Sequence, residues 1–183
     1  MVSKILTRTL LASVFLFAAA SGRAQSVARL SNPVVSFFSS APLEDIEAVN
    51  KKASGVVDWS KRSFLISIPI KGFEFRSGLM QSHFNENYLE SDKYPDCTYR
   101  GTISGPVDLT KDGDYPVVTT GDLTIHGVTQ RRSIPATISV RKGIASVSSK
   151  FNIRVADHKI AIPKMVFKKI AEVVAVTINS NLQ

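Results

Sequence analysis

The feature that most constrains the fold of this chain is a period-two alternation of apolar and polar residues. It recurs at residues 63–70, 122–126, 133–140 and 145–155, and a β-branched run follows at 174–178. Alternation of this kind places apolar side chains on one face of a half-buried strand. Several short strands separated by turn residues are typical of an antiparallel sandwich or barrel. The sequence therefore predicts an all-β fold.

Turn residues and prolines punctuate these runs. The predicted turns fall at Ser54-Gly55, Lys111–Asp114, Gly127–Gln130 and Lys142-Gly143. Pro69 and Pro135 occupy outward positions of two strands. A sheet edge or a bulge tolerates the missing N–H donor of proline, so we expect such a feature at both positions.

Two segments depart from the alternation. Residues 77–90 space their apolar side chains as in a helix, and Ser77 is placed to cap that helix. Residues 163–170 begin with a proline and predict another short helical turn. No linker or repeat divides the chain between these segments, so we expect one domain over residues 25–183.

The first 24 residues have the pattern of a cleaved secretory signal peptide. Lys4 and Arg8 precede an uncharged, mostly apolar run at 10–20, which is too short to span a bilayer. Gly22 and Ala24 then supply small residues at the two positions that a signal peptidase recognises before its cleavage site. We expect cleavage near Ala24 and a periplasmic or secreted protein. The alternative is an N-terminal anchor that stays in the membrane.

The net charge of the chain becomes smaller once this peptide is removed. The whole chain has 23 Lys and Arg against 15 Asp and Glu, a formal net charge of +8. Cleavage removes three basic residues and no acid, which leaves +5. The remaining basic residues are dispersed, whereas nucleic-acid binding calls for a basic stripe or patch. We expect no nucleic-acid partner, and transient contact with a membrane surface is compatible with this charge.

Residues that could carry chemistry are few. His83, His126 and His158 lack the helical spacing of a zinc motif, and hydrogen-bonded structural roles are favoured for all three. Cys97 is the only cysteine, so it forms no disulfide within the chain and is expected to pack as a small hydrophobe. We predict no catalytic residue, no metal site and no cofactor. An exported enzyme with His83 or His126 as acid–base is the alternative.

Phenylalanine is the prominent aromatic residue. Eight of the ten phenylalanines follow the predicted signal peptide. Together with the aliphatic residues of the strands, they could fill a core or line a tunnel for an alkyl chain. An eight-stranded barrel is wide enough for either arrangement.

Two blocks of sequence combine histidine, glycine and aromatic residues. The first runs from His83 to Pro95 and contains the Tyr94-Pro95 step, and the second, at 121–130, contains Gly121, His126 and Gly127. The two blocks resemble the YceI-like family of exported lipid-binding proteins, and the second is similar to the family pattern G-x-L-T-I-H-G-V-T. The resemblance covers roughly residues 32–178. Asn85 and Asn87 depart from the residues common in the family. These departures bear on the headgroup of the ligand rather than on the fold.

The resemblance implies an extended, lipocalin-like antiparallel β-barrel of about eight strands with one or two short helices and an elongated apolar cavity. It also implies a long-chain ligand such as a polyisoprenoid, an isoprenoid quinone or a fatty-acid amide, held for transport or storage. We expect the inward strand residues to line the cavity: Phe64, Ile66, Ile68, Leu123, Ile125, Ile138 and Phe151. A filled-core stress or adhesion module without a ligand is a further alternative. The oligomeric state is open, and a dimer is compatible with the sequence.

Overall fold

The computed structural model describes residues 26–163 and 170–183. The predicted signal peptide, residues 1–24, lies outside the described residues, and so does most of the helical turn expected at 163–170. Among the described residues, no helix is long and apolar enough to cross a membrane.

Strands dominate the regular structure of the described residues. They are β1 (Val27–Ser40), β2 (Asp45–Asn50), β3 (Ser54–Asp58), β4 (Ser63–Pro69), β5 (Phe73–Phe75), β6 (Asp96–Ser104), β7 (Gly113–Ile125), β8 (Val128–Arg141), β9 (Ile144–Arg154) and β10 (Val173–Leu182). The short helical elements are the α-helix α1 (Gly78–His83), the π-helical turn η2 (Phe84–Tyr88), and the 3₁₀ turns η1 (Ile70–Gly72) and η3 (Val155–His158).

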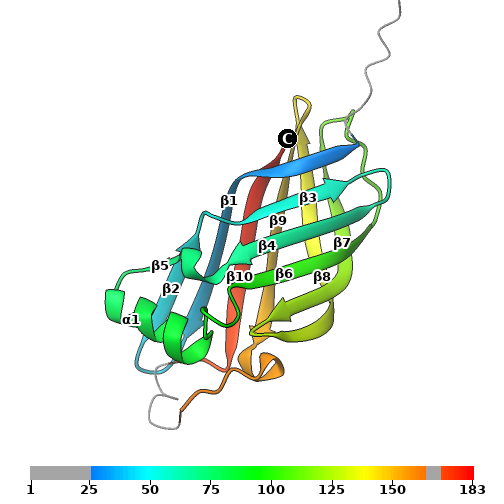
Figure 1. Cartoon of the computed structure of the whole chain (residues 1–183). Coiled ribbons are helices and arrows are strands. Elements are labelled where there is room, and N and C mark those ends of the chain that lie inside the picture. The colour runs from blue at the N-terminus through cyan, green and yellow to red at the C-terminus, as the bar shows by residue number, and fades with distance from the viewer. Residues whose placement is uncertain (1–25, 164–169) are drawn as a thin grey trace, which may run out of the picture.

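These strands form one antiparallel sheet that closes on itself. Hydrogen-bonded neighbours follow the order β10-β9-β8-β7-β6-β4-β3-β1, and β1 pairs again with β10. The eight strands make a closed barrel, which β2 and β5 extend beside β1 (Figure 1). The predicted fold, an extended antiparallel barrel of about eight strands with one or two short helices, is confirmed.

The two ends of the barrel differ. The helix end carries α1, η2, η3 and the β7–β8 turn, whereas the closed end carries the β3–β4 turn, the β8–β9 turn and the C-terminus (Figure 1). Strand β1 pairs with β3 through Val27–Arg29 and with β2 through Val35–Ser40. An irregularity between Ser31 and Val34 separates these two stretches. Because β2 and β5 join only the second stretch, they widen the helix end.

Prolines mark places where ladders stop. The β8–β9 ladder runs from Arg141 to Thr137 on β8 and ends there. Two residues further along β8 lies Pro135, which has no N–H to donate. Its carbonyl accepts instead from the Ser149 hydroxyl at 2.7 Å. Pro69 is the last residue of β4, so both prolines occupy positions that a missing donor does not disturb.

The predicted turns are partly right. Lys142-Gly143 is a turn as predicted and joins β8 to β9. The turn predicted at Gly127–Gln130 lies at His126-Gly127 instead, because Val128 already begins β8. All four residues of these two turns have positive φ, as a two-residue turn of type I′ requires. The other two predictions are wrong. Ser54-Gly55 is not a turn but the start of β3, where both residues pair with β4. The turn expected at Lys111–Asp114 lies earlier, because the Lys111 N–H donates to Asp108 and Gly113 already begins β7.

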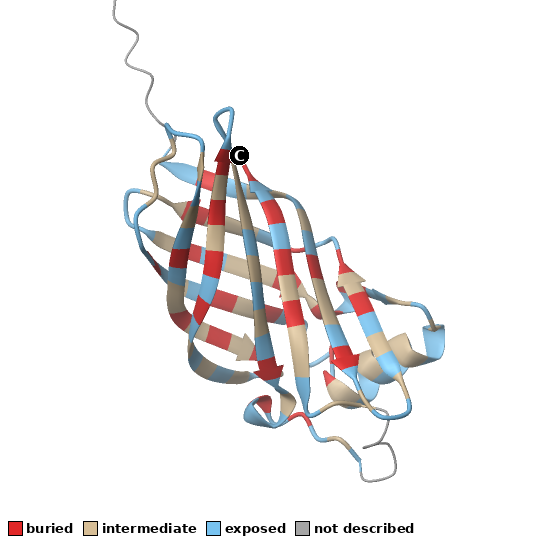
Figure 2. Ribbon diagram, turned by 180° about the vertical axis from the view of Figure 1, so that it is seen from behind, coloured by how far each residue is buried: buried red, intermediate tan, exposed pale blue. Residues whose placement is uncertain are grey.

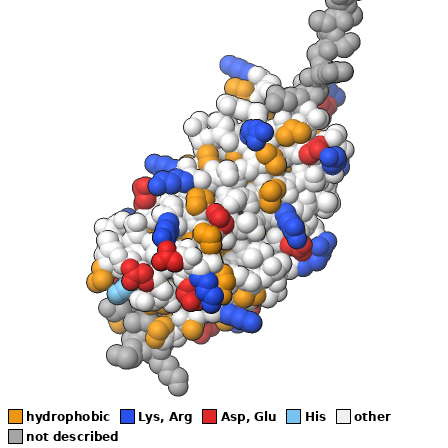
Figure 3. Space-filling view, viewed as in Figure 1, with side chains coloured by type: hydrophobic (Ala, Val, Ile, Leu, Met, Phe, Trp, Pro, Cys, Tyr) orange, Lys and Arg blue, Asp and Glu red, His pale blue; other side chains and the backbone are white. Residues whose placement is uncertain are grey.

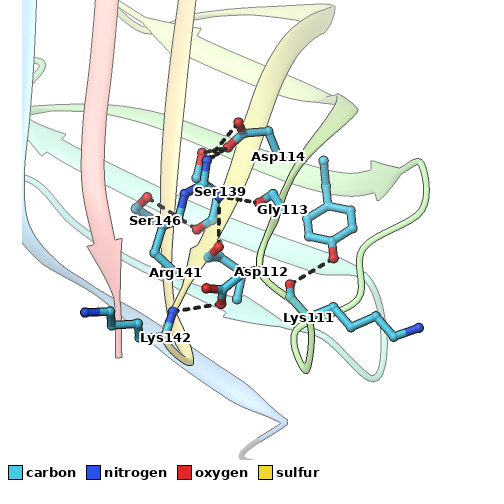
Figure 4. Close-up of polar contacts among 10 residues, drawn as sticks. Lys111, Asp112, Gly113, Asp114, Ser139, Arg141, Lys142 and Ser146 are labelled. Atoms are coloured by element: carbon cyan, nitrogen blue, oxygen red, sulfur yellow. Dashed lines mark hydrogen bonds and ion pairs between the residues drawn. The ribbon is translucent and has the colours of Figure 1, made fainter.

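Packed side chains fill the closed end. Buried and exposed residues alternate along the strands that meet there (Figure 2). The inward residues include Ile134, Ile138 and Val140, which are at most 3% exposed. Polar contacts tie the strands at the rim, where Arg141 binds Asp114 at 2.8 Å and the Lys142 N–H donates to Asp112 at 2.7 Å (Figure 4).

Candidate functional site

The helix end holds a short insertion between β5 and β6. Ser77 begins it, and its hydroxyl accepts from the Met80 N–H at 3.5 Å, as the sequence predicts for a cap. The Leu89 N–H donates to the Phe84 carbonyl at 2.9 Å, an i to i−5 bond that makes η2 a π-turn. None of the residues of α1 is buried. Its apolar residues Leu79 and Met80 line a space inside this end of the barrel.

That space is an internal cavity of about 450 Å³. Its wall comes from α1, from the turns η1, η2 and η3, from all strands except β3 and β8, and from residues between η3 and β10 such as Ile160. It consists almost entirely of Ile, Val, Leu, Phe and Tyr side chains. The uncharged exceptions are Ser39, Ser77 and Met80, and the titratable side chains other than tyrosine are Glu44, His83 and Cys97. Such a chamber, apolar with a few polar groups, is the usual form of a small-molecule site.

A cluster of four phenylalanines forms one side of the wall. Phe37 of β1, Phe73 and Phe75 of β5, and Phe84 of η2 have ring centroids between 5.0 and 5.8 Å apart. Rings at these separations attract one another beyond their burial of area. The cluster therefore fastens the insertion to the β2–β5 extension and leaves apolar ring surface toward the cavity.

The cavity reaches solvent beside α1. Leu79 and His83 both line it, and both are exposed. Glu44, in the turn between β1 and β2, and Ser77 supply polar atoms at the same end. The surface around the barrel is mixed in charge, with basic and acidic side chains interspersed on the face seen in Figure 3.

The predicted lining residues divide into two groups. Five belong to the cavity wall: Ile66, Ile68, Leu123, Ile125 and Phe151. Phe64 and Ile138 also point inward but lie nearer the closed end, where they join the packed core. Sequence reasoning missed the phenylalanine cluster and the β10 residues Val174, Val176 and Ile178. The abundance of phenylalanine was the available signal for the cluster.

The two motif blocks meet at the helix end. Nε2 of His126 lies 2.6 Å from a carboxylate oxygen of Glu90. The Tyr94 ring packs edge-on against the His126 ring, with 4.7 Å between the ring centroids. A Cβ at Gly127 would come within 2.4 Å of the Tyr94 ring. The Pro95 carbonyl accepts from the Ile70 N–H at 2.8 Å. The contacts of Glu90 and Tyr94 thus fix the end of the insertion to the β7–β8 turn, and Pro95 joins it to η1.

Both ring nitrogens of His126 face oxygen atoms. Nδ1 lies 3.2 Å from the His158 carbonyl, opposite the Glu90 contact of Nε2. The two contacts hold the ring between the end of the insertion and the η3 turn. His126 does not line the cavity, whereas His83 does. This arrangement fits the structural role favoured for His126.

His158 is fully buried beneath the same turn. Its Nδ1 donates to the Val128 carbonyl at 3.1 Å, and its Nε2 has no partner among the described residues. Burial lowers the pKa of His158, because the charged ring would lose its hydration. The ring is therefore neutral at physiological pH.

Cys97 lies in the cavity wall and is also buried. Burial, and secondarily the charge of Asp96, raises the pKa of the Cys97 thiol to about 12. A thiol in this state is a poor nucleophile and behaves as a small apolar group. Within residues 26–163 and 170–183, no group of three or more His, Cys, Asp or Glu side chains could hold a metal ion.

A family comparison agrees with this geometry. The sequence profile of the YceI-like domain matches residues 30–182, which include both motif blocks and nearly the whole barrel. The chain belongs to the YceI-like family. The resemblance expected from the two blocks is thus confirmed. None of the curated proteins is significantly similar to the chain.

Solved structures share this YceI-like fold at low sequence identity. BcnA of Burkholderia cenocepacia is 17% identical, with a TM-score of 0.70 over 83% of this chain and 98% of its own. A polyisoprenoid binding domain from Saccharophagus degradans, implicated in plant cell wall breakdown, is 15% identical, with a TM-score of 0.72 over 86% and 98%. The YCEI protein of Campylobacter jejuni is 21% identical, with a TM-score of 0.58 over 72% and 81%.

Proposed function

We propose that the protein binds a long-chain amphiphile, such as a polyisoprenoid, an isoprenoid quinone or a fatty-acid amide, in the cavity at the helix end. The observation that carries this proposal is the cavity of about 450 Å³ with an almost wholly apolar wall. Each CH₂ group that leaves water for such a wall contributes about 0.8 kcal/mol. The similar domain described as polyisoprenoid binding supports the same class of ligand.

The orientation of the ligand follows from the wall. Polar atoms gather at the opening, where Glu44, Ser77 and His83 lie, whereas the deeper residues such as Leu123 and Phe151 are apolar. The headgroup therefore stays at the opening beside α1, and the tail points toward the middle of the barrel.

The proposal includes export. Residues 1–24 carry the signal peptide pattern, and a carrier or store of lipid in the periplasm or outside the cell fits a barrel that shields its ligand from water. Cell fractionation and N-terminal sequencing of the mature protein test this part. A mature protein that still begins at residue 1 would contradict it.

Binding is tested with the full mature chain. Organic extraction of the purified protein followed by mass spectrometry should recover an amphiphile, and the emptied protein should bind farnesol, decaprenol or a ubiquinone saturably. Incubation with the native protein and incubation with His83→Ala should both leave the ligand chemically unchanged. A product formed by the native protein and lost in His83→Ala would favour the enzyme alternative.

Two adjacent valines of β10 provide a matched pair of variants. Val174 lines the cavity, whereas Val173 is 42% exposed on the outside. Val174→Trp should lower the affinity about tenfold or more by filling the chamber, and Val173→Trp should change it less than about twofold. Circular dichroism checks that both are folded. A folded native protein that yields no amphiphile and binds none of the probes contradicts the proposal.

A further inference from the structure

The cavity stops near the middle of the barrel. Its wall includes Ile66 and Ile68 of β4, but Phe64, the next inward residue toward the closed end, is absent from it. On β10 the wall likewise includes Ile178 but neither Ser180 nor Leu182. One layer of the barrel therefore separates the cavity from the packed closed end.

Tyr99 of β6 forms the floor at this layer. Its ring lies edge-on to the Phe64 ring at 4.8 Å, and Phe64 is buried behind it. Tyr99 pairs with Ile66 on one side and with Leu123 on the other, and all three belong to the cavity wall. The ring is thus the deepest side chain of β6 that an occupant could touch.

The Tyr99 ring is held by its hydroxyl. The oxygen lies 3.0 Å from the Thr119 carbonyl and 3.3 Å from the Arg132 carbonyl, so it reaches from β6 across β7 to β8. On β7, the residue that pairs with Arg132 is Gly121. Because glycine has no side chain, Gly121 leaves room for the Tyr99 ring between β6 and β8. Swinging the ring aside would leave a buried hydroxyl without its partners, which is costly.

We propose that Tyr99, with Phe64 behind it, is the stop that sets the length of tail the cavity accepts; this inference rests on the proposed lipid binding. A tail enters beside α1, and its end abuts the Tyr99 ring. Chains longer than the distance from the opening to Tyr99 keep their excess length outside the protein. Only the part of the tail between the opening and this ring is therefore buried.

The test is a homologous series of saturated 1-alkanols bound to the emptied full-length mature protein. Affinity should rise about fourfold with each added CH₂ while the new carbon is buried, and then level off. The length at which it levels off is the readout. Tyr99→Ala should move that length to longer chains, and Ile66→Phe should move it to shorter ones. Leu65→Ala, on the outer face next to Ile66, should leave it unchanged.

The limiting chain length is measured separately for each variant. If one variant does not fold, the others still test the proposal. A limiting length that stays the same in the folded variants overturns the stop at Tyr99 while leaving lipid binding intact. An affinity that keeps rising beyond any chain length in the native protein overturns it as well. Absence of binding at every length contradicts the proposed function instead.

Discussion

The cavity half and the closed half of this barrel share most of their strands and the same alternation, yet only one of them encloses a chamber. The closed half brings eight strands together around residues such as Ile134 and Val140. In the cavity half, the β2–β5 pair and the insertion at 77–90 push the wall outward. Alternation thus determines which side chains point inward. The perimeter of the barrel determines whether side chains from opposite walls pack against one another or leave a cavity.

The largest effect on this difference is expected from a substitution in the layer between the two halves. Gly101 and Gly121 face each other across β6 and β7, and a Cβ at Gly121 would lie 2.0 Å from the Arg100 carbonyl oxygen. Gly121→Ala should therefore cost about 3 kcal/mol or more of the free energy of unfolding, measured in urea. Gly78→Ala is the control, because the added Cβ meets no atom within 4 Å beyond its chain neighbours and its own helix backbone. Equal stability of the two variants would show that the strands at the floor can separate freely.

Truncation of one isoleucine in each half compares them directly. Ile138→Ala removes packed atoms in the closed half and should cost about 2–5 kcal/mol. Ile66→Ala widens a chamber that already exists, so its cost should be roughly half as large. Denaturant unfolding measures both. A larger loss for Ile66→Ala would mean that the cavity wall, and not the closed half, holds the barrel together.

Sequence reasoning reached the barrel and much of the wall, and its failures have physical causes. Alternation identified the inward faces of β4, β7 and β9, including Ile68, Ile125 and Phe151. It could not tell that Phe64 and Ile138 lie on the packed side, because depth along a barrel depends on strand register and on the β2–β5 extension. The contact between Glu90 and His126 was equally hidden, since 36 residues separate them in the chain.

Acid should weaken the helix end before the closed end. Burial lowers the pKa of His158 below its ordinary 6.5, so the unfolded chain binds a proton where the folded chain does not. The contribution to the free energy of unfolding is therefore complete above pH 6.5 and falls as the pH drops below it. His158→Gln should be less stable than the native protein at pH 7 and should lose less stability between pH 7 and 5.

The closed end provides the control for that titration. Hydrogen bonds from Ser139 and Arg141 lower the pKa of Asp114 below 3.8, so its contribution is present above that pH and is lost only as the pH falls through this lower range. Asp114→Asn should leave the slope between pH 7 and 5 unaltered. Identical pH profiles for the native protein and His158→Gln would remove His158 as the source of acid sensitivity.

The smallest effect concerns the single thiol in the cavity wall. Because its pKa is raised to about 12, Cys97 is almost entirely protonated at pH 8 and should react with iodoacetamide far more slowly in the native protein than after unfolding in urea. Adding an alkanol should change the slow native rate little, since protonation rather than access limits it. Fast alkylation that an alkanol blocks would instead show that water fills the cavity half down to Cys97. The apolar character that distinguishes this half would then depend on its ligand.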